Sequence, residues 1–95
     1  METMLDIVKK RLPEGIKISA VKEDRSKYEL TLTDGECSSK CWVNKEYAPN
    51  MYERAADGAI YNAMAGIALA HGDIEKGKEF LAKIVELGAV SAGRN

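Results

Sequence analysis

The chain has 95 residues, with 14 lysines and arginines against 15 aspartates and glutamates, so its net charge is −1. This length predicts one domain with a real but modest core. The balanced charge argues against binding to a nucleic-acid polymer, which requires clustered positive charge.

The N-terminal part of the chain predicts a short helix followed by a strand. Thr3–Leu12 has apolar residues on one face, Thr3 can cap its start, and Pro13 stops it. The alternation in Ile16–Ala20 is typical of a half-buried strand. The charged residues 22–27 predict a turn.

Two further strands complete a predicted antiparallel meander. Tyr28–Thr33 alternates clearly, and the dipeptide Asp34-Gly35 predicts a tight turn into a third strand over Glu36–Val43. The residues expected to face inward are Tyr28, Leu30, Leu32, Cys37, Ser39, Cys41 and Val43. Trp42 is expected on the opposite face of the third strand.

The stretch Pro49–His71 predicts a long central helix, because it is rich in alanine and other helix formers. It is apolar on two sides. One stripe consists of Tyr52, Ala56, Ala59, Ile60, Ala63, Ile67 and Ala70, and the other of Tyr61, Met64, Ala65, Ala68 and Leu69. Two coverings are open: the sheet plus a second subunit, or the sheet plus the last helix of the same chain. Its polar residues argue against a membrane span.

Gly58 and Gly66 lie inside this predicted helix. Each glycine costs about 1 kcal/mol relative to alanine in a helix interior. We expect such glycines where another backbone comes close and the packing offsets this cost.

A last helix is predicted over Ile74–Leu87, with Asp73 as its cap. The residues expected on its packed side are Ile74, Gly77, Leu81, Ile84, Val85 and Gly88. The expected fold is therefore α+β: an N-terminal helix, a three-stranded meander, and a hairpin of two helices. We expect one domain over residues 1–95, with 88–95 as a frayed tail.

The sequence offers little for catalysis or metal binding. Cys37 and Cys41 are the only cysteines and His71 is the only histidine, so one chain cannot supply four zinc ligands. No phosphate loop, dinucleotide fingerprint or nucleophile motif occurs. We expect no enzyme and no cofactor. Of the two interpretations of His71, a base or ligand and a helix C-terminal residue that favours the dipole, we prefer the second.

Five residues are candidates for binding a ligand: Trp42, Lys45, Tyr47, Arg54 and Asn62. An outward Trp42 near Lys45 and Tyr47 can stack a base or another planar group. The start of the long helix suits an anion, and Arg54 can add a bidentate contact. The alternatives are that Trp42 packs under a helix or subunit, and that the helix start is an ordinary solvated turn.

Three segments resemble a family of small tailed-phage proteins. They are Tyr28–Gly35, Cys41–Tyr47 and Glu53–Ala63. The family pattern is a T-L-T-L-x-N-G hairpin, a strand, an aromatic residue in the loop, and a helix ending in N-A. Some members are anti-Thoeris sponges, which oligomerise and sequester cyclic ADP-ribose signals without cleaving them. The resemblance implies ligand contact near Trp42, Tyr47, Arg54 and Asn62.

The expected function is that of a phage-type accessory, anti-defence protein. It would form a homo-oligomer through the long helix and sequester a nucleotide-like signal, such as a cyclic nucleotide, without turnover. The alternative is a protein–protein interaction module that inhibits or adapts a host protein. Because Met1–Met4 has no basic start and no apolar segment follows, we expect a cytoplasmic protein, in the host cytoplasm if phage-encoded.

Overall fold

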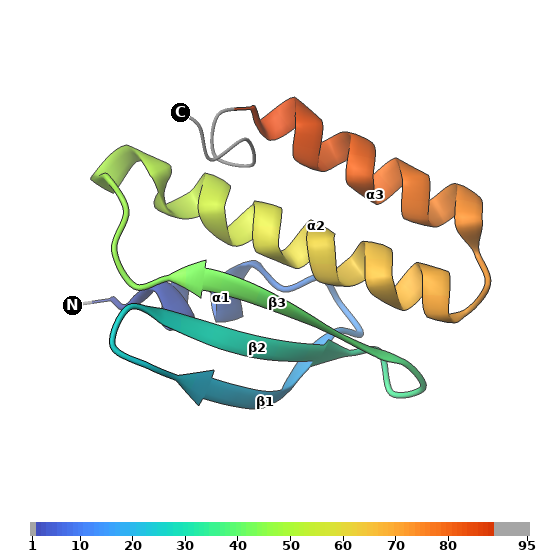
Figure 1. Cartoon of the computed structure of the whole chain (residues 1–95), viewed down its shortest axis with the longest axis horizontal. Coiled ribbons are helices and arrows are strands. Elements are labelled where there is room, and N and C mark those ends of the chain that lie inside the picture. The colour runs from blue at the N-terminus through green and yellow to red at the C-terminus, as the bar shows by residue number, and fades with distance from the viewer. Residues whose placement is uncertain (1, 89–95) are drawn as a thin grey trace.

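The computed structural model describes residues 2–88, which form three helices and one sheet (Figure 1). In chain order the elements are α1 (Met4–Arg11), β1 (Lys17–Glu23), β2 (Lys27–Thr33), β3 (Ser38–Asn44), a 3-10 turn (Pro49–Met51), α2 (Tyr52–Ala70) and α3 (Ile74–Leu87). The predicted α+β class and element order are confirmed. The predicted frayed tail lies outside the described residues, apart from Gly88.

The sheet is an antiparallel meander in the order β1-β2-β3. The burial of β2 alternates as predicted, with Tyr28, Leu30 and Leu32 buried. The predicted end of β1 at Ala20 is wrong, because the strand continues to Glu23. It pairs with β2 from Lys17 to Glu23, with a shift of register between Ile18 and Ala20. β1 is an edge strand whose side chains are mostly exposed, so backbone pairing rather than apolar alternation sets its length.

The start of β3 also differs from the prediction. The strand begins at Ser38, because Glu36 and Cys37 belong to the turn that follows β2. The Asp34 carboxylate accepts the backbone N–H groups of Glu36 (2.8 Å) and Cys37 (2.9 Å). These donors are therefore satisfied outside the strand ladder. Further along, Cys41 and Val43 are buried whereas Trp42 is exposed, as the alternation predicts.

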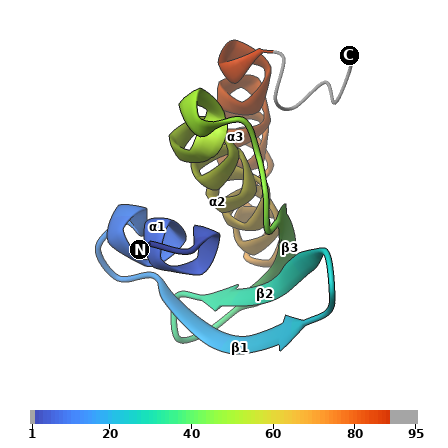
Figure 2. The same ribbon diagram turned by 90° about the vertical axis from the view of Figure 1, so that its left-hand side faces the viewer.

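Helix α1 packs on the same face of the sheet as α2, as the view along the helices in Figure 2 shows. A reciprocal capping box between Thr3 and Asp6 fixes its start. Met4 and Val8 are the buried residues of α1, and they join the core beneath α2. Their burial places α1 where it closes the sheet face beside the central helix.

Helix α2 lies between the sheet and α3, so most of both apolar stripes is covered by the same chain, apart from Leu69 and Ala70 at its end (Figures 1 and 2). Ala59, Ala63 and Ala68 are all buried, Ala63 completely. Of the two coverings that the sequence leaves open, the structure has the one within a single chain. No helix within residues 2–88 is both long and apolar enough to cross a membrane.

The packed side of α3 is only partly the predicted one. Ile74, Leu81 and Val85 are exposed, at 59%, 45% and 75%. Gly77 and Ile84 do turn toward the protein as predicted, and they are joined there by Phe80 and Leu87. Apolar residues lie on more than one side of α3, so helical periodicity alone fits two faces, and contact with α2 selects one of them.

Candidate functional site

Three of the five predicted ligand residues line one surface groove beside α2. Trp42 comes from β3, Tyr47 from the loop after it, and Asn62 from α2. The groove encloses about 340 Å³. The full lining, which we call the Trp42 groove, consists of Trp42, Tyr47, Ala55, Gly58, Ala59, Asn62 and Ile84.

Trp42 reaches the groove because its side chain points outward from β3, which is an edge strand of the sheet. Its neighbours Cys41 and Val43 point into the core, which turns the indole outward and leaves it 49% exposed. β3 is the edge strand that packs against α2, so an outward side chain on it can reach the seam between the sheet and the helix. The indole therefore offers an accessible aromatic face with a polar N–H.

Tyr47 is held in place by a hydrogen bond within the loop after β3. Its hydroxyl accepts the backbone N–H of Asn44 at 3.2 Å, which closes the loop after β3. The ring is half-buried and joins the edge of the core cluster. A ring fixed in this way loses little conformational entropy when a ligand packs against it.

Asn62 and the small residues of α2 form the helical wall of the groove. Ala55, Gly58, Ala59 and Asn62 follow one another at spacings of three, one and three residues, so they share a side of the helix. Their small side chains leave the groove open above the backbone. The amide of exposed Asn62 provides both donors and an acceptor for a polar ligand edge.

Arg54 does not line the groove but lies close to it along α2. It is four residues before Gly58, which places it on the same side of the helix, one turn nearer the start. The side chain is exposed and makes no ion pair or hydrogen bond to another residue in 2–88. This guanidinium is therefore free to meet an anion at the mouth of the groove.

Lys45 is directed elsewhere. Its ammonium donates to the Glu23 carboxylate at 2.6 Å and lies 5.3 Å from the centroid of the Tyr28 ring. The hydrogen bond to Glu23 raises the pKa of Lys45. The structure thus brings together Trp42, Tyr47 and Asn62, and separates Lys45 from them.

The acidic side chains at the start of α2 are paired with a cation that comes from α1. Arg11 of α1 donates to both carboxylate oxygens of Asp57, at 2.7 and 2.8 Å, and lies 3.7 Å from Glu53. This bidentate pair ties α1 to the first turns of α2. The acidic residues of α2 are therefore matched by a cation that comes from another helix.

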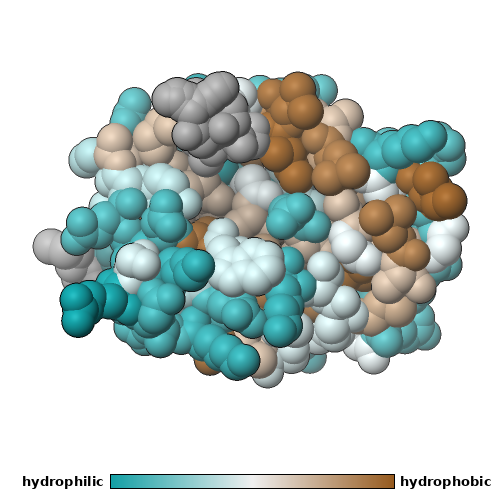
Figure 3. Space-filling model, in the orientation of Figure 1, coloured by the Kyte–Doolittle hydropathy of each residue, from teal (hydrophilic) through white to brown (hydrophobic). Residues whose placement is uncertain are grey.

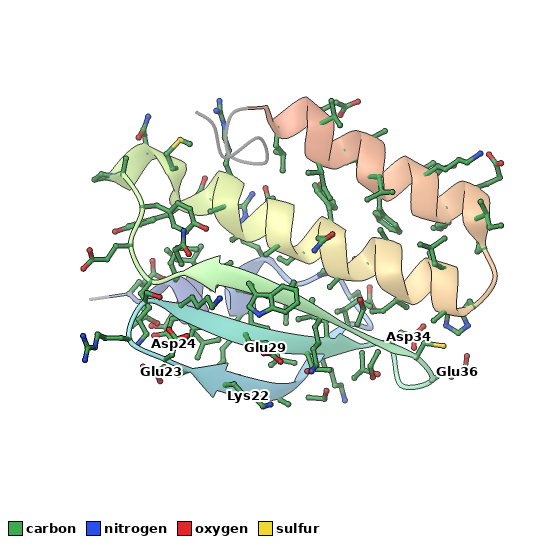
Figure 4. The ribbon with its side chains drawn as sticks, viewed as in Figure 1. Lys22, Glu23, Asp24, Glu29, Asp34 and Glu36 are labelled. Carbon is green, nitrogen blue, oxygen red and sulfur yellow. The ribbon has the colours of Figure 1, made fainter. Side chains whose placement is uncertain are left out.

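A second polar cluster, which sequence reasoning missed, lies at the opposite end of α2. It consists of Asp34, Glu36 and Cys37 from the turn after β2 and His71 from the end of α2, and we call it the Cys37 cluster. Figure 4 shows Asp34 and Glu36 at the end of the sheet beneath the α2–α3 connection, away from Glu23 and Asp24. The sequence favours His71 as a partner of the helix dipole over a role as a base or ligand, and it gives no sign of the residues that surround it here.

The lengths of the elements are the one signal that points to the Cys37 cluster. The 19 residues of α2 span ~28 Å at ~1.5 Å each, whereas the seven of β3 span ~23 Å at ~3.3 Å each. Because α2 returns along β3, its last residue reaches the turn from which β3 began. Within residues 2–88, no group of three or more histidine, cysteine and acidic side chains has a geometry that could hold a metal ion.

No protein-family model, no curated protein and no solved structure matches the chain. The resemblance to small tailed-phage proteins therefore stays a prediction.

Proposed function

We propose that the chain is a non-catalytic binding module that holds a small nucleotide-like molecule in the Trp42 groove. The observation that carries this proposal is the convergence of Trp42, Tyr47 and Asn62, from three separate segments, on one groove. The resemblance in sequence favours the same function: a phage-type anti-defence protein that sequesters a signal molecule, such as a cyclic nucleotide or a cyclic ADP-ribose, without cleaving it.

Each part of the groove suits one part of such a ligand. A planar base can stack on Trp42 and pack against Tyr47, and stacking on an aromatic side chain contributes about 1–3 kcal/mol per base. The amide of Asn62 matches the mixed donors and acceptors of a base edge. Arg54, one turn away, can pair with a phosphate.

Isothermal titration of the whole chain against cyclic nucleotides and cyclic ADP-ribose isomers tests the proposal. We expect binding to the wild type, and a loss of about tenfold or more in affinity for Trp42→Ala and for Asn62→Ala. Lys45→Ala is the matched control, since Lys45 points toward Glu23 and not into the groove. No heat with any compound of the panel at micromolar protein would exclude this function.

The role of Arg54 is tested by comparing the binding of a nucleotide with that of the corresponding nucleoside. Arg54→Ala should weaken the binding of a nucleotide but leave that of the corresponding nucleoside unchanged, because only the phosphate is negatively charged. Arg25→Ala is the control, since Arg25 is an exposed arginine at the turn between β1 and β2. Equal losses for nucleotide and nucleoside would remove Arg54 from the site.

The outer face of α3 favours a second candidate function, a protein–protein interaction module. Ile74, Leu81 and Val85 leave apolar surface exposed along this helix. Figure 3 shows hydrophobic side chains gathered along the edge where α3 runs and at the end where α2 and α3 join. Since α2 is covered, the predicted homo-oligomer is proposed here through α3 instead.

Light scattering coupled to size exclusion separates these possibilities. A mass above that of one chain, reduced to the monomer by Val85→Glu, would support self-association through α3. A monomer that retains one stoichiometric protein from a bacterial lysate, and no small molecule, would favour the interaction module over the nucleotide-binding function.

A further inference from the structure

The Cys37 cluster has the geometry of an activated thiol. Nδ1 of His71 lies 3.7 Å from Sγ of Cys37, and Nε2 of the same ring lies 2.7 Å from Oδ2 of Asp34. The imidazole thus stands between a potential nucleophile and a carboxylate. This order of nucleophile, base and orienting acid is the arrangement that activates a side chain for attack.

The carboxylate determines which ring nitrogen can accept a proton. Hydrogen bonds from the backbone N–H groups of Cys37 and Glu36, and then from His71, hold the pKa of Asp34 far below its ordinary value. An ionised carboxylate only accepts, so Nε2 of His71 must carry the hydrogen that it donates. In the neutral ring the lone pair is then on Nδ1, which faces the Cys37 thiol.

The backbone of Cys37 is held by the turn. The Cys37 carbonyl accepts from the Thr33 hydroxyl (2.8 Å) and the Asp34 amide (3.2 Å), and its own amide donates to Asp34 (2.9 Å). Both His71 and Cys37 are partly exposed, so a small reagent can reach them. The backbone therefore positions the sulfur against the ring at an accessible place.

We propose that Cys37 is a nucleophilic thiol, activated by His71 and oriented through Asp34, that undergoes exchange with small neutral or cationic disulfides. The thiol proton passes to Nδ1 of His71, and the thiolate attacks one sulfur of the reagent. The reagent S–S bond breaks as the mixed disulfide forms on Cys37. The departing thiolate takes the proton from His71, so Cys37 is oxidised and half of the reagent is reduced.

The charges around His71 determine which disulfide reacts. Asp34 and Glu36 from the turn, and Asp73 beyond the end of α2, all surround the ring and raise the pKa of His71, with the Asp34 hydrogen bond as the largest cause. They stabilise the imidazolium that forms during transfer but repel an anionic reagent. Cystamine, which is cationic, should therefore react faster than oxidised glutathione, which is anionic.

The chain contains its own inert cysteine for comparison. Cys41 is fully buried under α2, and burial raises the pKa of its thiol to about 12. Peptide mapping by mass spectrometry after exposure of the whole chain to cystamine should find the mixed disulfide on Cys37 and none on Cys41. Modification of Cys41 at the same rate would show that unfolding, and not activation, exposes the thiols.

The pH dependence of the exchange rate tests the activation itself. At pH 7.5, where a larger share of the His71 rings is neutral than at pH 6.5, we expect the wild type to react at least about fivefold faster than His71→Gln, which can keep a bond to Asp34 but cannot take a proton. Asp34→Asn should slow the reaction likewise, because an amide donor would reverse the tautomer of the ring. If Asp34→Asn does not fold, as judged by circular dichroism, His71→Gln alone decides. Wild-type and His71→Gln rates that coincide from pH 6 to 8 would overturn the proposal.

Discussion

The two glycines inside α2 have opposite surroundings, and this difference gives a sharp test of the packing. A Cβ added at Gly66 would lie 2.0 Å from Oγ and 2.8 Å from Cβ of Ser39 on β3. A Cβ added at Gly58 would meet only Cδ1 of Leu87, at an ordinary 3.7 Å. The helix approaches the sheet closely at one glycine and not at the other.

The expected magnitudes follow from these distances. Alanine gains about 1 kcal/mol over glycine in a helix interior, and Gly58→Ala should show most of this gain. At Gly66 the Ser39 hydroxyl can rotate away, but its Cβ is fixed to the strand, whereas carbon atoms prefer about 3.5–4.0 Å. Overpacking costs about 1–3 kcal/mol, and so close a carbon–carbon approach belongs to the upper part of that range, about 2–3 kcal/mol. After the helix gain of about 1 kcal/mol is subtracted, Gly66→Ala should be destabilised by about 1–2 kcal/mol net.

Thermal unfolding followed by circular dichroism measures both variants. For a chain of this size 1 kcal/mol corresponds to about 4–8 °C in Tm, so Gly66→Ala should melt about 4–16 °C lower and Gly58→Ala several degrees higher. Adding Ser39→Gly to Gly66→Ala should recover part of the loss, which a double-mutant cycle detects. Equal stabilisation by both alanines would refute the close approach of α2 to β3.

Three other perturbations test the core, the Cys37 cluster and the α1–α2 contact. Ala63→Glu places a carboxylate at a site that is fully buried within one chain. Circular dichroism should therefore show an unfolded chain, and not a folded monomer released from an oligomer. Because the His71 pKa is raised above 6.5, its protonated form stabilises the fold below that pH and the contribution is lost as pH rises through the folded value. The Tm difference between wild type and His71→Gln should therefore shrink from pH 6 to 8, and a constant difference would contradict the pairing with Asp34. Asp57→Asn should lower stability by about 1 kcal/mol at low salt and less at 1 M salt, since it removes the bidentate charge pair with Arg11.

The main elements could be predicted because their patterns are local. Alternation in β2 places Leu30 and Leu32 in the core, and the same rule turns Trp42 outward. The end of β1 could not be predicted in this way, because an edge strand can carry charged residues on both sides. The predicted packed face of α3 was wrong in part, at Ile74, Leu81 and Val85, for a different reason. Apolar side chains occupy two faces of this helix, and only contact with α2 decides between them.

The two candidate sites also differ in how far their residues lie apart along the chain. Trp42 and Tyr47 are close in the chain, so their proximity could be expected, whereas Asn62 joins them only because α2 returns along β3. The pairing of Asp34 with His71 spans 37 residues and has no local signature. Such pairs become visible only when the lengths and directions of the elements are known together.

The claim that the Trp42 groove is a ligand site can be tested through its own fluorophore. Trp42 is the only tryptophan of the chain, so its emission reports on the groove alone. Titration with cyclic nucleotides and cyclic ADP-ribose isomers should produce a saturable change in this emission, which Asn62→Ala weakens and Lys45→Ala leaves intact. An emission spectrum that does not respond to any of these compounds would contradict the account.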